Sequence, residues 1–124
     1  KKYIPSIYPA VPSFNLLASA YKYKPNANYG IVRSHDGFYM DDNEQCEDFW
    51  TSKGIIAADM ESGILFIVGR QRNIETLSIL TNVVPYKNDL REGVNNFVDQ
   101  DRQMIKGEKE AIKLALDILS DSFI

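Results

Sequence analysis

The sequence predicts an α/β fold built on a largely parallel sheet. Short apolar runs of strand length alternate along the chain with longer segments that have helical spacing. The run at residues 55–58 is apolar without polar alternation, which is typical of a strand buried on both faces. Strands that alternate with helices indicate βαβ units with right-handed crossovers. We therefore expect the strands to share one direction.

Length and composition predict one small domain over residues 1–124, with an ordinary hydrophobic content of 44%. The formal net charge of -3, without a cluster of lysine and arginine, argues against a nucleic-acid partner. No apolar run reaches the roughly 18 residues that a membrane span needs. A single cysteine, Cys46, and a single histidine, His35, offer no transition-metal site. We expect a cytoplasmic protein without a metal or cofactor.

The first predicted elements are a helix and a strand. Ser13 is a candidate N-cap for a helix over residues 13–23, in which apolar residues form a stripe. Pro25 ends this helix. Residues 29–32 predict a strand, and the sequence Ser-His-Asp-Gly at residues 34–37 has the chemistry of a turn.

A second helix and the central strand follow. Residues 41–52 begin with acidic side chains that complement a helix dipole, and we expect Phe49 and Trp50 to pack in the core. The central strand occupies residues 55–58. Residues 61–73 are long enough for a helix and are apolar on most sides, with arginines near the end where the dipole favours cations.

The last part of the chain predicts a strand and a helix. Residues 75–84 have strand character and end at Pro85, before a polar loop that continues to about residue 101. The chain then ends in an amphipathic helix. Its apolar positions with helical spacing are Ile105, Ile112, Ala115, Leu116 and Leu119.

The junction between the central strand and the next helix carries two carboxylates, Asp59 and Glu61. An open α/β fold binds its ligands at the carboxyl edge of the sheet, and the segments after all three predicted strands should meet there. The alternative interpretation of both residues is helix capping and first-turn charge, which requires no function.

Two ordered motifs resemble the nucleoside phosphorylase family. They are GIVRSHDGFY at residues 30–39 and ADMESGILF at residues 58–66. Uridine phosphorylase, hexameric purine nucleoside phosphorylase and methylthioadenosine phosphorylase typically show Ser-Ser-Asp-x-Phe-Tyr and then Glu-Met-Glu-Ala at the head of a helix. PAVPSF at residues 9–14 is also similar to the family, so the resemblance covers essentially the whole chain. It implies a three-layer α/β/α fold.

The resemblance implies a pentosyltransferase that cleaves the N-glycosidic bond of a nucleoside with phosphate, giving free base and ribose 1-phosphate. Glu61 matches the carboxylate that accepts hydrogen bonds from the ribose hydroxyls. Met60 matches the methionine along the sugar, and Phe38 matches the aromatic that packs against the nucleoside. An anion near the ring suits this chemistry, because the sugar becomes oxocarbenium-like. The family also implies a homo-oligomer, a hexamer built from dimers.

Three departures from the family pattern bear on the substrate. Asp59 stands where members carry the first Glu, which shortens the reach to ribose. Val83-Val84 replaces the Ser-Asp pair of purine-specific members, and residues 40–44 lack the Gln and Arg with which uridine phosphorylases hold uracil. The missing purine-type Asp favours a pyrimidine nucleoside, while the base stays open.

The glycine-rich phosphate loop of the family has no counterpart in these residues. Members are considerably longer, so the chain resembles their C-terminal half, with a missing N-terminal half as its partner. A second hypothesis accepts the fold but assigns an inactive fragment or a nucleoside-binding or assembly remnant. A third is a signalling receiver domain with Asp59 as the phosphorylated residue and Asp41-Asp42 as its acidic pair. Their spacing argues against it, because only one helix fits between the pair and Asp59.

Overall fold

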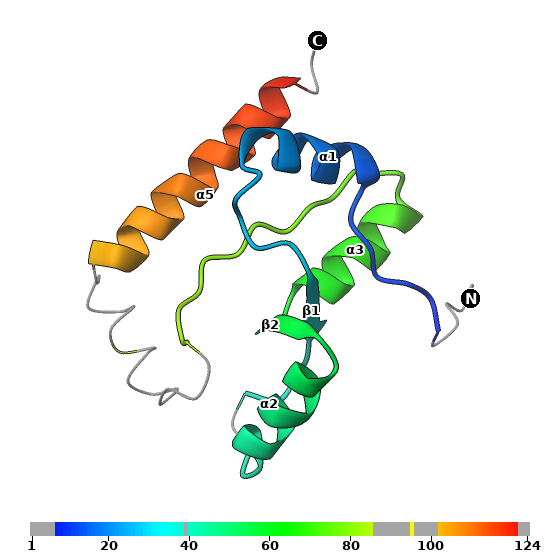
Figure 1. Ribbon diagram of the computed structural model, residues 1–124. Helices are drawn as coiled ribbons and strands as arrows, with labels where there is room; N and C mark the ends of the chain where they lie inside the picture. The colour runs from blue at the N-terminus through cyan, green and yellow to red at the C-terminus, as the bar shows by residue number, and fades with distance from the viewer. Residues whose placement is uncertain (1–6, 39, 86–94, 96–101, 122–124) are drawn as a thin grey trace. The chain divides into compact units, whose positions relative to one another are not determined.

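The computed structural model describes residues 7–38, 40–85, 95 and 102–121. In chain order its elements are α1 (Phe14–Tyr23), β1 (Ile31–Ser34), α2 (Asn43–Ser52), β2 (Ile55–Asp59), α3 (Ser62–Gln71) and α5 (Arg102–Asp121) (Figure 1). The chain divides into two compact units. The first unit holds the described residues up to Ala18 and Asn28–Ser78, and the second holds Ser19–Ala27 and the described residues from Ile79 onward.

Among the described residues, the sheet in the first unit has two strands, and they are parallel as predicted. β1 begins at Ile31, two residues later than expected, and β2 extends through Asp59. The register places Ser34 opposite Asp59. The carboxyl ends of the two strands are therefore level with each other, which is the geometry that the alternation of strands and helices predicted.

The prediction of a third strand over residues 75–84 is wrong, because the structure has no strand there. The backbone N–H of Ser13 donates to the carbonyl of Thr76 over 2.8 Å, and the N–H of Thr76 donates to the Ser13 hydroxyl over 2.9 Å. Both polar backbone groups of Thr76 thus bind the residue before α1 instead of a strand. The side chains suit a strand, but a strand also needs a hydrogen-bonded neighbour.

Ser13 occupies the predicted cap position of α1. Its carbonyl accepts a hydrogen bond from the Leu17 N–H, the bond that begins a helix at its N-cap.

Gly69 in α3 allows the segment after α3 to lie close against the end of α3. A Cβ built on Gly69 would stand 2.4 Å from Cγ2 of Thr76. Only glycine allows this approach.

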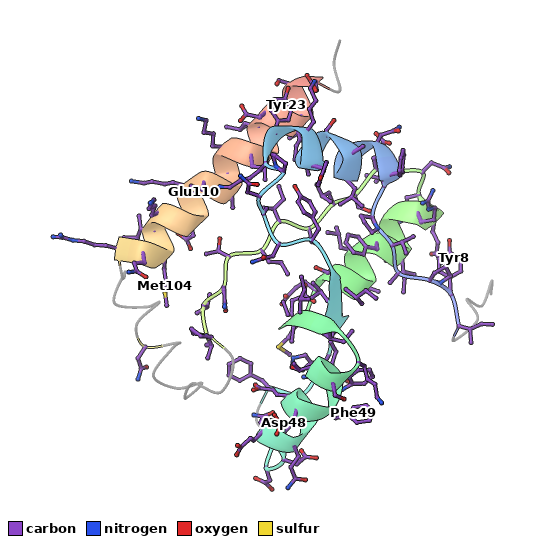
Figure 2. All side chains as sticks on the ribbon, in the orientation of Figure 1. Tyr8, Tyr23, Asp48, Phe49, Met104 and Glu110 are labelled. Carbon is purple, nitrogen blue, oxygen red and sulfur yellow. The ribbon has the colours of Figure 1, made fainter. Side chains whose placement is uncertain are left out.

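The expected burial of Phe49 and Trp50 is wrong. Their exposed fractions are 54% and 38%, and α2 has no buried residue. The two rings contact each other edge to face at 5.2 Å between centroids. Figure 2 shows Asp48 and Phe49 among the side chains of α2. Both aromatics are large apolar groups without a covering layer in the described part of the chain.

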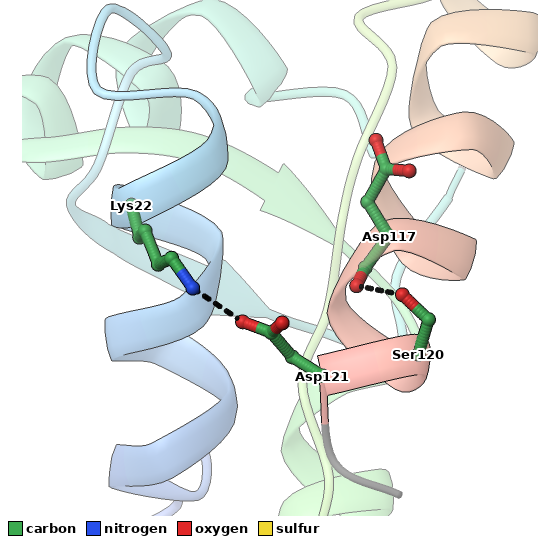
Figure 3. A network of polar contacts seen from close by, with 4 residues as sticks. All are labelled: Lys22, Asp117, Ser120 and Asp121. Carbon is green, nitrogen blue, oxygen red and sulfur yellow. Dashed lines mark hydrogen bonds and ion pairs between the residues drawn. The ribbon is translucent and has the colours of Figure 1, made fainter. Parts of the chain in front are cut away.

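The core of the second unit joins the end of α1 to α5. Ala20, Leu114 and Ile118 are buried there. Lys22 binds Asp121 over 2.8 Å at the rim of this core (Figure 3), and Lys24 binds Glu110. The C-terminal helix is amphipathic as predicted, but the predicted stripe is displaced, because Ile112, Leu116 and Leu119 are exposed. None of the described helices is long and apolar enough to cross a membrane.

The apolar run of β2 and α3 stays largely exposed in the described chain. Ile56 in β2 is 52% exposed and Ile64 in α3 is 62% exposed, and Leu65 and Val68 are also exposed. We predicted that β2 would be buried on both faces. This prediction is wrong in the described chain, where no residue of β2 is buried. Parallel strands of this composition normally lie under layers on both sides.

Candidate functional site

The candidate site lies at the carboxyl ends of β1 and β2. Ser34 ends β1, Asp59 ends β2, and Glu61 stands at the N-cap position of α3. Two short strands and a helix start therefore bring polar side chains together within the first unit. This is the edge at which open α/β sheets bind ligands.

Both carboxylate oxygens of Asp59 accept hydrogen bonds. The Ser34 hydroxyl donates to Oδ1 over 2.7 Å, and the Ser62 N–H donates to Oδ2 over 2.8 Å. Burial by itself raises the pKa of Asp59, but the hydrogen bonds from Ser62 and Ser34 favour the charged form and leave that pKa below its ordinary value. Asp59 is therefore held as a carboxylate by its neighbours.

Glu61 has a different environment two residues later. It is exposed, and its side chain makes no capping hydrogen bond to α3. Its Oε2 accepts a hydrogen bond from the Met60 N–H over 3.1 Å. The helix-capping interpretation thus fits Asp59, which binds the first amide of α3, and does not fit Glu61. The Glu61 carboxylate is therefore exposed and does not bind the helix start.

The predicted apolar contacts of the site are accessible. Phe38 and Met60 are each 38% exposed. Met60 lies between the two acidic residues, whereas Phe38 stands four residues beyond the end of β1. Both side chains therefore leave apolar area accessible.

Ser34 is the site residue that sequence reasoning missed. Its hydroxyl donates to Asp59 and also accepts the Gly63 N–H over 2.9 Å. A polar residue that opens the predicted turn, shortly after a strand, was the available signal. His35 lies in the predicted turn. Its Nδ1 is buried without a partner among the described residues, and its backbone N–H donates to the carbonyl of Asp59.

A pocket of about 310 Å³ lies elsewhere, at the opposite end of α3. It is lined by Ser13, Phe14, Asn15, Arg70, Asn73, Ile74 and Glu75. None of the predicted site residues lines it. The described residues also hold no group of three or more His, Cys, Asp or Glu side chains that could bind a metal ion. The candidate site is thus an open edge of carboxylates and half-exposed apolar side chains.

Comparison with known proteins identifies relatives of the chain. The sequence profile of the phosphorylase superfamily matches residues 1–120. A DeoD-type purine nucleoside phosphorylase of Levilactobacillus brevis is 32% identical over 89% of this chain and 45% of the relative. The uridine phosphorylase of Treponema pallidum is 27% identical over 94% of this chain and 50% of the relative.

A solved structure shows the same relationship in three dimensions. The crystal structure of uridine phosphorylase from Vibrio fischeri superimposes with a TM-score of 0.81 at 42% identity, covering 96% of this chain and 49% of that one. The predicted fold class is confirmed as an α/β portion of a uridine phosphorylase fold. The chain spans about half the length of each of these proteins.

Proposed function

The chain belongs to the phosphorylase superfamily, and we propose that it supplies the ribose-side and base-side residues of a nucleoside phosphorylase. In this reaction a phosphate oxygen bonds to C1′ of the sugar while the N-glycosidic bond breaks and its electron pair leaves with the base. The products are the free base and ribose 1-phosphate. One observation carries the proposal: Glu61 stands exposed at the carboxyl edge of the sheet without a capping bond.

Glu61 is the catalytic residue of this proposal. Its carboxylate accepts hydrogen bonds from the ribose hydroxyls and lowers the energy of the positive charge that develops on the sugar. Met60 lies along the sugar, and Phe38 packs against the nucleoside. A contact between Asp59 and ribose also stays a prediction. Both carboxylate oxygens of Asp59 already accept hydrogen bonds from within the chain.

A pyrimidine nucleoside is the proposed substrate. The Vibrio fischeri relative at 42% identity is a uridine phosphorylase. Val83 and Val84 also stand where purine-specific members carry a Ser-Asp pair that assists the leaving purine. A valine side chain cannot donate a proton or hydrogen bond to a purine, whereas a pyrimidine leaves as an anion stabilised by its own carbonyl groups.

Phosphate is the second substrate, and we propose that it binds to another polypeptide segment that corresponds to the N-terminal half of the relatives. The site edge holds Asp36, Asp59 and Glu61, whose charges repel an anion. The exposed apolar residues of β2 and α3 offer the surface that this half would cover. The complete enzyme is proposed to act in the cytoplasm as a homo-oligomer built from dimers.

A chimera tests the proposal. Residues 1–120 replace the matching half of the Vibrio fischeri uridine phosphorylase, and phosphate-dependent release of base is measured with uridine, inosine and methylthioadenosine. We expect release from uridine and its loss in Glu61→Ala. Glu47→Ala, which removes an exposed carboxylate from α2, is the matched control. A folded chimera that releases no base, or one that is indifferent to Glu61→Ala, contradicts the proposal.

A further inference from the structure

We infer that Ser34 and Asp59 form a clamp that holds Glu61 in position, so that Asp59 acts on the nucleoside through Glu61. The inference rests on the proposed function, because it assigns a role to the second acidic residue of the same site. Asp59 is then a positioning residue, and Glu61 is the residue that touches the sugar.

Three hydrogen bonds make up the clamp. Oδ1 of Asp59 accepts from the Ser34 hydroxyl over 2.7 Å, and Oδ2 accepts from the Ser62 N–H over 2.8 Å. The same Ser34 hydroxyl accepts from the Gly63 N–H over 2.9 Å. The ends of β1 and β2 are thereby tied to the first turn of α3. Met60 and Glu61 lie within the short loop that these bonds close.

The clamp releases Glu61 from capping the helix. A residue at the N-cap position ordinarily uses its side chain to accept from one of the first free amides of the helix. Here Asp59 accepts the Ser62 amide and Ser34 accepts the Gly63 amide. Glu61 therefore makes no side-chain capping bond, and its side-chain Oε2 accepts the Met60 N–H instead.

Gly63 shows that the clamp depends on a close approach. A Cβ at this position would stand 3.0 Å from Cβ of Ser34 and 3.3 Å from its hydroxyl oxygen. A larger residue would require Ser34 to shift by a few tenths of an ångström, which strains its bonds to Asp59 and to the residue 63 amide. A direct contact between Asp59 and ribose would instead require Asp59 to give up a hydrogen bond to Ser34 or Ser62.

NMR on the full 124-residue chain tests the clamp without any substrate. The variants are Ser34→Ala, Asp59→Asn and Gly63→Ala, and Ser52→Ala is the control, since it removes a hydroxyl that binds Phe49 in α2. We expect amide exchange at Ser62, and at residue 63, to accelerate on the order of tenfold in the three variants. The three-bond couplings that report χ1 of Glu61 should change from values typical of a single rotamer to values averaged over several rotamers. Unchanged Glu61 couplings, with these amides released, overturn the inference.

Kinetics in the chimera distinguish positioning from direct contact. Asp59→Asn and Ser34→Ala should each lower kcat/KM about tenfold, and neither should lower it further in a Glu61→Ala background. Additive losses would show that Asp59 touches the nucleoside itself and would overturn the inference. A chimera that releases no base contradicts the proposed function, and the NMR result still decides whether the clamp holds Glu61.

Discussion

The Ser34 hydroxyl donates a hydrogen bond to Oδ1 of Asp59 over 2.7 Å, across the carboxyl ends of two parallel strands. The bond joins residues that are 25 positions apart in the sequence. It couples the stability of the sheet edge to the ionisation of the Asp59 carboxylate, so the free energy of unfolding should depend on pH.

Asp59→Asn should change how stability responds to acid. The folded-state pKa of Asp59 is below its ordinary value, so its contribution is present above the unfolded pKa of about 3.9 and is lost as pH falls through the folded pKa. We expect Asp59→Asn to lower the free energy of unfolding at pH 7 by about 1 kcal/mol, since solvent partly screens the half-exposed carboxylate.

Urea denaturation from pH 7 to pH 2 measures this difference, which should close as the pH falls below the folded-state pKa of Asp59. Glu110 and Asp121 also have lowered pKa values, because Lys24 and Lys22 bind them, but they titrate in both proteins and cancel. A difference that does not vary with pH would show that the charge of Asp59 is irrelevant to stability.

Glu61→Ala should damage turnover in the chimera more than any other single change. The variant loses charged hydrogen bonds worth roughly 1.5 to 3 kcal/mol each, so kcat/KM should fall by on the order of tenfold to several hundredfold. Glu61→Gln should bind nucleoside better than Glu61→Ala yet remain slow, since the amide carries no negative charge. Steady-state kinetics with uridine provide the measurement, and normal phosphorolysis by folded Glu61→Ala rules out this role.

Phe38→Ala should weaken nucleoside affinity in the chimera while leaving its thermal transition nearly unchanged. The side chain is 38% exposed, so its removal leaves little core cavity. Calorimetric titration with uridine and a thermal melt measure the two effects. The opposite pattern, a large fall in Tm with unaltered affinity, would make Phe38 a packing residue.

The 124-residue chain by itself should not catalyse phosphorolysis. Attack on the sugar needs a phosphate held in line with the leaving base, and binding that anion requires preorganised amides or cations. Arg33 donates to Cys46 and Arg70 lines the pocket at the other end of α3. The assay is phosphate-dependent base release from uridine, inosine and methylthioadenosine. Robust turnover by the pure chain would require a phosphate site among its own cations.

Gly69→Ala should destabilise the first unit by about 1 to 3 kcal/mol, because the new Cβ would stand 2.4 Å from Cγ2 of Thr76. Thr76→Ser removes that methyl group and should restore part of the loss in the double variant. Chemical denaturation of the two single variants and the double variant measures the coupling. Equal losses with Thr or Ser at position 76 would place the strain elsewhere, for example at the carbonyl of Ile74, 3.2 Å away.

Local patterns predicted much of the fold. The apolar run before Asp59 and the turn that begins at Ser34 located both strands to within two residues, and their parallel pairing followed from the helix between them. The third predicted strand failed for a reason that no local pattern contains. Thr76 binds Ser13, and its suitability for a strand does not create a neighbouring strand.

The candidate site was predictable in part. A carboxylate pair at a strand-to-helix junction identified the edge, but it did not distinguish the two residues. Only the register of β1 against β2 places Ser34 beside Asp59, and only that contact explains why Asp59 binds the helix while Glu61 does not. Burial of Phe49, Trp50 and β2 was mispredicted because apolar character reports what a side chain prefers, not whether a covering layer is present.

The exposed apolar strands have a further consequence for how the chain behaves in concentrated solution. Two short parallel strands with outer edges unpaired in the described residues form a template onto which another copy can add a strand. Repulsion between copies is weak, because the formal charge is only -3 and the isoelectric point is about 5.1. Mildly acidic buffers therefore remove the charge that keeps copies apart, while the unpaired strand edges remain exposed. The covering half proposed above would also protect this edge against aggregation.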